Sequence, residues 1–236
     1  MGAEPGGALA VLPVTGLPEI RPGARLGRLV AEHAELADGD VVVVTQKVVS
    51  KAEGRIVAVD AADPDAKRAL AESEAVRVLR RRGDLVVTET RHGFVCASSG
   101  VDLSNVEEGY AVLLPLDPDR SARRIRDELR GLGVEVGVIV SDTFGRAWRR
   151  GLTDVAIGCA GIAAVVDLKG ERDALGRELV ATEVCVVDEL ASAAELVMGK
   201  ASGVPVAIVR GADPSWFRES SVAAEIVRPY GEDLFR

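Results

Sequence analysis

Residues 136–154 read VGVIVSDTFGRAWRRGLTD, an apolar run that ends at an acid and a threonine and is followed by three arginines and a second acid. A continuous apolar run such as VGVIV is typical of a strand that is buried on both faces. Charges this dense after a buried strand belong either to a solvated turn or to the rim of a site. What else in the chain converges there decides between the two.

Similar apolar runs alternate with helical patterns along the rest of the chain. Short aliphatic runs that predict strands occupy residues 41–44, 85–88, 111–114, 184–187 and 206–209. Apolar residues at helical spacing predict helices within residues 26–33, 65–83, 117–133 and 188–199. In the third of these helices, Asp117 stands in the N-cap position and Pro118 in the first helical position.

This order of elements predicts a fold of the α+β (mixed α/β) class, with aliphatic sheets packed against helices. The chain shows no repeat and no low-complexity tract. We expect one domain over residues 1–236, whose division into two subdomains is left open, and a flexible N-terminus over residues 1–11.

The composition argues against two classes of partner. A net charge of −8 and an aromatic content of 3% do not favour a nucleic-acid surface, which needs basic groups and rings for base stacking. The longest apolar run is too short to cross a membrane, and the N-terminal residues lack the pattern of a signal peptide. Cys96, Cys159 and Cys185 form no CxxC motif and are expected to be buried thiols. We therefore expect a cytoplasmic protein.

Several common catalytic motifs are missing from the sequence. There is no P-loop, no GxSxG and no HExxH, and GLGVEVG only approaches a dinucleotide fingerprint. The two histidines, His33 and His92, are too few for a multi-histidine metal centre and are expected to be structural. Carboxylates, hydroxyls, lysines and arginines remain, and they suit a hard cation and phosphate groups.

Two acids are the candidate cation ligands. Asp102 lies in SSGVDLSN, three residues before Asn105, and Asp142 with Thr143 ends the strand of the opening stretch. One or two carboxylates, completed by hydroxyl, water and phosphate oxygens, commonly hold Mg²⁺ or Mn²⁺. Taken alone, each acid is more often a turn or strand-end cap.

Two further stretches have both a structural and a functional interpretation. TQKVVSKAEGR, residues 45–55, is either a solvated turn leading to another strand or the carrier of a lysine that faces phosphate. LPVTGLPEIRPG, residues 12–23, is a rigid loop that either connects two elements or offers backbone donors to a base.

Five stretches in order resemble one family. GLPEIRPG, DGDVVVVTQKVVSKAEGR, HGFVCASSGVDLSN, SDTFGRAWRRGLTDVAIG and VPVAIVRG are similar to motifs of the coenzyme F420:L-glutamate ligase (F420 gamma-glutamyl ligase) family. The resemblance runs from about residue 12 to about residue 235. Some bacterial members carry a further C-terminal flavin-binding domain, so the chain is expected to be a standalone enzyme or the ligase domain of such a protein.

The resemblance implies a family fold, a homodimer and a set of ligands. The substrates would be GTP, L-glutamate, coenzyme F420 and its glutamate-free precursor, with two Mg²⁺ or Mn²⁺ ions and a potassium requirement left open. The implied nucleotide contacts are Leu17, Pro18, Glu19, Ile20, Gln46, Lys51, Asn105, Met198, Gly199 and Lys200. Asp102 and Asp142 would share one ion, and Thr143 would help to bind the second. Two departures stand out: an expected metal-binding glutamine near Lys200 is absent, and Gln46 replaces a small hydroxyl residue.

The resemblance also implies a mechanism. GTP would phosphorylate the carboxylate tail, and the amine of glutamate would attack the acyl phosphate, with Asp142, Lys51 and Arg146 as the catalytic residues. Arg146 and Arg149 would bind the anionic coenzyme or glutamate, whereas Arg150 is expected on a solvated face. Two other functions stay open, a carrier of coenzyme or nucleotide and a metal-dependent GTP phosphohydrolase.

Overall fold

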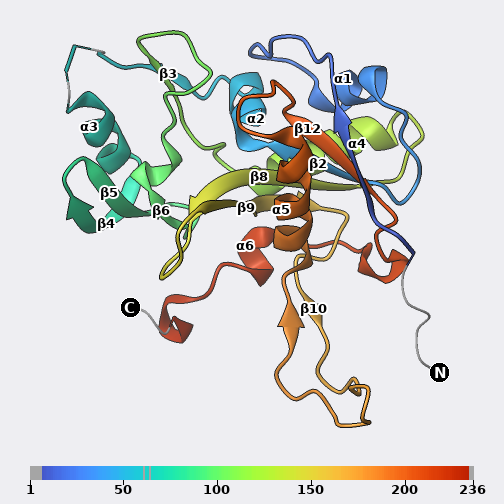
Figure 1. Ribbon diagram of the computed structural model, residues 1–236. Coiled ribbons are helices and arrows are strands. Elements are labelled where there is room, and N and C mark those ends of the chain that lie inside the picture. The colour runs from blue at the N-terminus through green and yellow to red at the C-terminus, as the bar shows by residue number, and fades with distance from the viewer. Residues whose placement is uncertain (1–6, 61, 64, 234–236) are drawn as a thin grey trace.

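A mixed five-stranded sheet is the centre of the computed structural model, which describes residues 7–60, 62–63 and 65–233 (Figure 1). The strand order is β1-β12-β2-β8-β9. The five strands are β1 (Ala10–Val14), β12 (Val206–Arg210), β2 (Val41–Thr45), β8 (Gly137–Gly145) and β9 (Leu152–Ala160). Only β2 and β8 run parallel, and the other neighbours are antiparallel. The fold is therefore α+β, as the sequence predicts.

The central strand β2 shows why its sequence is a run of four valines. Side chains alternate along a strand, so Val42 and Val44 face one side of the sheet, and Val41 and Val43 face the other. All four are fully buried. Both faces of the strand are thus covered at these four positions, and only Thr45, at its end, is polar and partly exposed.

Helices cover the two faces of the sheet. On one face lie α1 (Leu26–His33), α2 (Gln46–Ala52) and α4 (Pro118–Arg130), whose apolar side chains join those of Val42 and Val44 in one cluster. On the other face lies α5 (Val186–Met198), toward the arm that begins with β10 (Val166–Asp167) and β11 (Glu183–Val184) (Figure 1). The carboxylate of Asp117 accepts a hydrogen bond from the backbone N–H of Arg120, so the predicted N-cap of α4 is confirmed.

A smaller group of elements lies beside the sheet, away from β1 and β12 (Figure 1). The strands β4 (Ala75–Arg82), β5 (Leu85–Thr90) and β6 (Val95–Ala97) form one sheet, and β3 (Ile56–Ala58) pairs with β7 (Tyr110–Val112). The helix α3 (Ala66–Ser73) and the short 3-10 helix η1 (Ser98–Gly100) complete the group. Its own apolar cluster centres on Ala71, Val101 and Leu113. Because β6 contacts β8, the group lies close to the end of the central sheet.

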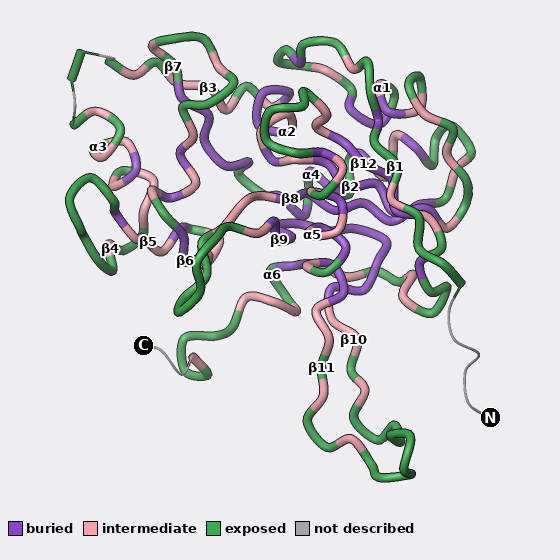
Figure 2. Tube along the Cα trace, viewed as in Figure 1, coloured by how far each residue is buried: buried purple, intermediate pink, exposed green. Residues whose placement is uncertain are grey.

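Two peripheral segments complete the described chain. The strands β10 (Val166–Asp167) and β11 (Glu183–Val184) begin an arm that extends away from the sheet and is mostly exposed (Figure 2). After β12 follow η2 (Pro214–Trp216), α6 (Val222–Glu225) and η3 (Tyr230–Glu232). Asp119 in α4 accepts hydrogen bonds from backbone N–H groups of β9 and α6, and so ties three elements together.

Three predicted elements differ from the structure. The expected helix over residues 65–83 ends at Ser73, because the following valines and arginines pair with β5 as strand β4. The run 184–187 is a strand only to Val184, and α5 begins at Val186 with two acids in its first turn. Residues 46–52 form helix α2, so the interpretation of 45–55 as a solvated turn is wrong.

The N-terminal segment is expected to be flexible over residues 1–11. Residues 1–6 of the expected flexible segment lie outside the described residues. Ala10 and Val11 pair with Arg210 and Val209. The last two residues of the expected flexible segment are therefore part of strand β1. Within the described residues, no helix combines the length and the apolar character needed to cross a membrane.

Candidate functional site

The candidate site is a pocket of about 380 Å³ between the loop after β1, helix α2 and the turn after α5. It brings together segments far apart in the sequence. The predicted nucleotide residues that line it are Leu17, Pro18, Glu19, Ile20, Lys51, Asn105, Met198, Gly199 and Lys200. The loop at 12–23 thus supplies a wall of the pocket, in line with its functional interpretation.

A second hollow of about 550 Å³ adjoins this pocket. Glu19, Ile20, Lys51 and Asn105 line both spaces, and Tyr110 lies only in the second. The Lys51 ammonium lies 2.5 Å from a carboxylate oxygen of Glu19. Lys51 is largely buried, whereas the Glu19 side chain is 72% exposed. The lysine is therefore fixed in place, and its present partner is free to leave.

Gln46 does not reach the pocket, contrary to the prediction. Its side-chain amide donates to the hydroxyl of Ser50 at 2.7 Å and to the backbone carbonyl of Leu113 at 3.0 Å. The residue is buried, because it is the first residue of α2 and faces the strand-to-loop segment after β7. Gln46 fastens α2 to that segment and is not a pocket-lining residue.

Lys47 also lines the pocket, and it pairs with Asp102. Its ammonium lies 2.9 Å from Oδ2 of Asp102 and 2.7 Å from the Ser104 hydroxyl. Burial disfavours the charged carboxyl, but the backbone N–H of Ser104 and the ammonium of Lys47 outweigh it, so the pKa of Asp102 lies below its usual value. Lys47 and Lys51 are one helical turn apart, so α2 presents two ammonium groups to the site.

Asp142 has the opposite electrostatic environment. Burial, opposed by the backbone N–H of Thr143 and reinforced by the negative charge of Asp154, raises the pKa of Asp142 to about 7. Lys200 lowers this pKa, and the negative charge of Asp102 makes the smallest contribution to raising it. A carboxyl group crowded by other carboxylates is one that a bound cation would stabilise in its charged form.

Thr143 lies opposite Asp154 in the β8–β9 hairpin, so the second acid of the opening stretch faces the residue that follows the first. The Thr143 hydroxyl donates to Oδ1 of Asp154 at 2.5 Å, and the Ser141 hydroxyl donates to Oδ2 at 3.0 Å. Only 1% of the Asp154 residue is exposed. The Ser192 hydroxyl of α5 donates to the backbone carbonyl of Asp154, which fixes the strand against the helix.

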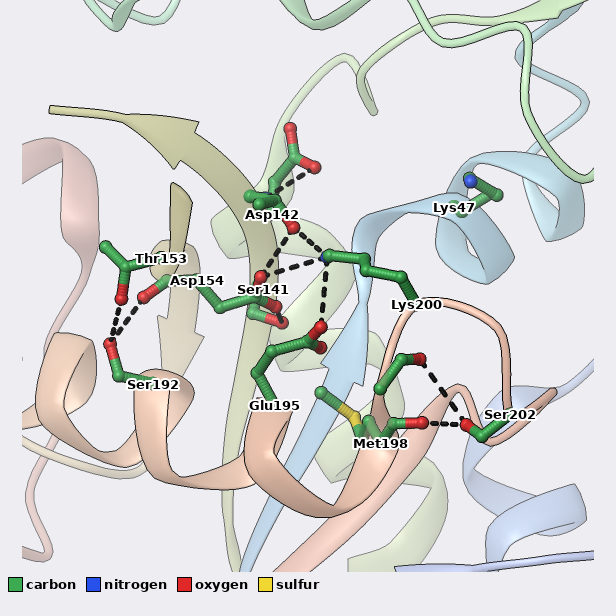
Figure 3. A network of polar contacts seen from close by, with 12 residues as sticks. Lys47, Ser141, Asp142, Thr153, Asp154, Ser192, Glu195, Met198, Lys200 and Ser202 are labelled. Atoms are coloured by element: carbon green, nitrogen blue, oxygen red, sulfur yellow. Dashed lines mark hydrogen bonds and ion pairs between the residues drawn. The ribbon is translucent and has the colours of Figure 1, made fainter. Parts of the chain in front are cut away.

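Lys200 closes this cluster from the turn after α5 (Figure 3). Its ammonium contacts the hydroxyl of Thr143, and it lies 3.2 Å from Oδ1 of Asp154 and 3.4 Å from Oε1 of Glu195. Partial burial disfavours the charged lysine, but Asp154 and Glu195 outweigh it, so the pKa of Lys200 lies above its ordinary value. Lys200 therefore lines the pocket and is also an ion-pair partner of the hairpin.

The predicted substrate arginines lie at the tip of the same hairpin. Arg146, Arg149 and Arg150 are exposed, between the end of β8 and the start of β9. None of them is among the residues that line the pocket. Trp148, between them, is 91% exposed and has a positive φ of 64°. The hairpin thus places Asp142 at its base and a basic, aromatic tip beyond it.

The donor set fits one divalent cation and does not fit a second. Across the described ranges, no three His, Cys, Asp or Glu residues are grouped to hold a metal ion by themselves. Asp102 and Asp142 supply hard oxygen donors for an ion that phosphate oxygens would complete. Lys47 also faces Asp102, but 39% of the Asp102 side chain is exposed, so an ion can approach this carboxylate from solvent, unlike that of Asp154. Around Thr143, the oxygens of Asp154 already face the ammonium of Lys200. A second divalent ion there would meet that positive charge, so the residues do not fit the expected second site.

The histidines and thiols take no part in these site contacts. His33 hydrogen-bonds to the carbonyl of Leu29, and His92 to those of Pro115 and Leu116, as structural residues do. All three cysteines are free, and burial raises the pKa of each thiol to about 12. They are therefore unreactive thiols in the folded chain.

Three charged residues described above are not among the predicted site residues: Lys47, Asp154 and Glu195. Asp154 stands in the opening stretch, and a hairpin centred on its arginines would have paired it with Thr143. Lys47 precedes Lys51 by four residues, a helical spacing hidden by the interpretation of this stretch as a turn. Glu195 leaves no sequence signal beyond its place near the end of α5.

Asp102, Asp142 and Thr143 do not line the pocket, but Lys47 and Lys200, which do, pair with Asp102 and contact Thr143. A polar pocket beside a sheet, with several charged groups in its lining and a strongly shifted carboxyl outside that lining, is typical of an enzyme site. The sequence profile of the F420-0:Gamma-glutamyl ligase family matches residues 16–211. A protein of Methanopyrus kandleri named coenzyme F420:L-glutamate ligase is 45% identical over the whole of both chains. Proteins of the same name from Methanothermobacter thermautotrophicus and Methanocaldococcus jannaschii are 41% and 42% identical over 97% and 89% of this chain, and over 99% and 90% of theirs. The chain belongs to the F420-0:gamma-glutamyl ligase family.

Proposed function

We propose that the protein is a GTP-dependent ligase that adds L-glutamate to the carboxylate tail of coenzyme F420 and of its glutamate-free precursor. The observation that carries the proposal is the convergence of the predicted nucleotide residues on one pocket, with Lys51 buried in its wall. The negative charge of Asp102 contributes to the raised pKa of Asp142, which is consistent with a shared cation. The names of the relatives support the choice of coenzyme and amino acid.

The reaction needs an activated carboxylate. A tail oxygen attacks the γ-phosphorus of GTP, the bond to the β-phosphate oxygen breaks, and GDP leaves. The amine of glutamate then attacks the acyl carbon of the resulting acyl phosphate, phosphate departs, and the amine loses a proton as the amide forms. Such phosphoryl transfer depends mainly on positioning and on neutralising oxygen charge. A side chain that acts as nucleophile is not needed, which agrees with the inert thiols.

The charged residues divide this work. Lys51, and beside it Lys47, would neutralise phosphate oxygens from α2. Asp102 and Asp142 would hold Mg²⁺ or Mn²⁺, which supplies charge neutralisation at the transferred phosphoryl group. Arg146 and Arg149, at the hairpin tip, would bind the anionic coenzyme or glutamate. A potassium requirement stays an expectation of the family resemblance.

We also propose that residues 1–236 act as one ligase domain that forms a homodimer. The arm between β10 and β11 exposes Leu175 and Val180, each at least 80% accessible, away from the pocket. Light scattering of the purified chain gives its mass in solution, and a monomer at all concentrations would contradict this part of the proposal.

The test of the function is a coupled count of products. The protein is mixed with GTP, Mg²⁺ or Mn²⁺, L-glutamate and the glutamate-free precursor, and mass spectrometry follows the coenzyme while GDP is measured. We expect mass steps of one glutamyl unit, each matched by one GDP. GDP release that does not depend on glutamate would indicate a phosphohydrolase. Bound coenzyme with neither GDP nor a mass change would indicate a carrier.

A further inference from the structure

The ammonium of Lys200 lies where hairpin, helix and pocket meet. Its side chain is 60% exposed, yet its tip reaches Asp154, whose side chain is only 1% exposed. Two further oxygen groups surround the ammonium, the hydroxyl of Thr143 and the carboxylate of Glu195. Two carboxylates and a hydroxyl around one positive charge are the kind of oxygen donors that also hold a hard metal ion.

The buried carboxylate of Asp154 has no other cation close to it in the described contacts. Ser141 and Thr143 each donate a hydrogen bond to one of its oxygens, and both donors are neutral. A buried carboxylate without a cation is costly, so Lys200 supplies the positive charge that balances Asp154. The cluster is thus complete without a second metal ion.

The geometry also excludes simultaneous occupation. A divalent ion on Thr143 and Asp154 would lie within a few ångströms of the ammonium, and both are positive. Burial strengthens this repulsion, because the low dielectric of the interior screens it poorly. Either the lysine or the ion occupies the cluster.

We propose that Lys200 is a tethered cation that replaces the second divalent ion, so that the protein binds one exchangeable ion, at Asp102 and Asp142. This inference rests on the proposed function for its purpose, since the ammonium would face the phosphates of a nucleotide in the pocket that Lys200 lines. Its geometric basis, the contacts of Lys200, does not depend on the proposed function. The contacts of Lys200 with the hairpin hold the ammonium in the place of the second ion, and its position in the pocket lets it face the phosphates.

The test counts Mn²⁺ ions bound per chain by electron paramagnetic resonance, with and without the β,γ-imido analogue of GTP. The wild type should bind one ion, and Lys200→Gln, which removes the charge and adds an amide oxygen, should bind one ion more under the same condition. Lys200→Arg keeps the charge and should behave as the wild type. Lys169→Gln, an exposed lysine of the arm paired with Glu183, is the matched control and should also bind one ion.

A double variant shows where the extra ion binds. Adding Asp154→Asn to Lys200→Gln should return the count to that of the wild type, and circular dichroism confirms that each variant is folded. Two ions in the wild type, or equal counts in the wild type and Lys200→Gln, would overturn the proposal. The count with Mn²⁺ alone needs neither nucleotide nor coenzyme, so it stands even if the ligase assay fails.

Discussion

Asp142 is a carboxyl group whose pKa the fold raises toward neutral pH. Its pKa is raised to about 7, first by burial and then by neighbouring carboxylates. The folded state therefore binds the proton more tightly than the unfolded chain does, and the stability that this gives is lost as the pH rises from about 4 to about 7. At pH 8 without metal, the charged Asp142 lowers the stability of the fold.

Asp142→Asn should therefore be more stable than the wild type at pH 8 in the presence of a chelator, and should lose nearly all turnover. We expect a gain on the order of 2 kcal/mol, or a rise of about 4–8 °C in the melting temperature. The difference should shrink toward pH 4, and added Mg²⁺ should stabilise only the wild type. Scanning calorimetry measures both effects. A less stable variant at pH 8 would contradict the assigned environment.

Lys51 is the residue on which nucleotide binding should depend most. Lys51→Ala removes a charged hydrogen bond from a buried position, an interaction of about 1.5–3 kcal/mol. We expect affinity for the GTP analogue to fall by roughly tenfold to a hundredfold in calorimetric titration. Lys169→Ala is the control because its lysine is exposed on the arm. An unchanged dissociation constant would remove Lys51 from the pocket's phosphate contacts.

At the scale of elements, the β8–β9 hairpin separates two tasks along its length. Its base holds Asp142 and Asp154, and its tip carries exposed arginines. Arg146→Ala should raise the KM for coenzyme or glutamate by roughly tenfold, as expected for the loss of about 1.5 kcal/mol, with kcat changed less. Steady-state kinetics for each substrate give the result. Arg150→Ala, expected on the solvated face, is the matched comparison, and equal effects of the two would contradict the assignment.

The contact between β9 and α4 should be the most sensitive joint of the central layers. A Cβ on Gly158 would lie 2.3 Å from the carbonyl carbon of Pro118, at the start of α4. Gly158→Ala must therefore push strand and helix apart, at a cost of about 1–3 kcal/mol. Denaturant unfolding should show the lower midpoint with a similar slope. Gly133→Ala serves as a contrast, since its added Cβ meets no atom within 4 Å and only the positive φ opposes it.

At the scale of the whole molecule, the sequence predicts the elements whose structure is decided by neighbouring residues. The valines of β2 must be covered on both faces, and the Asp117 cap starts α4 without help from distant residues. The helix expected over 65–83 failed because pairing with β5, a non-local interaction, determines β4. The family resemblance located most pocket residues. Asp154 and Glu195 could not be found in this way, because only the hairpin register and the packing of α5 place them beside Lys200.

The ion pair between Glu19 and Lys51 has a consequence for the protein as an acidic molecule of net charge −8. A phosphate that reaches Lys51 must release Glu19 to water, so nucleotide binding exchanges one counter-ion for another and adds no new pair at this lysine. Dissolved salt screens the old pair and the new one alike. The contribution of Lys51 to nucleotide affinity should thus depend only weakly on ionic strength, in contrast to that of a lysine with no partner before the phosphate arrives.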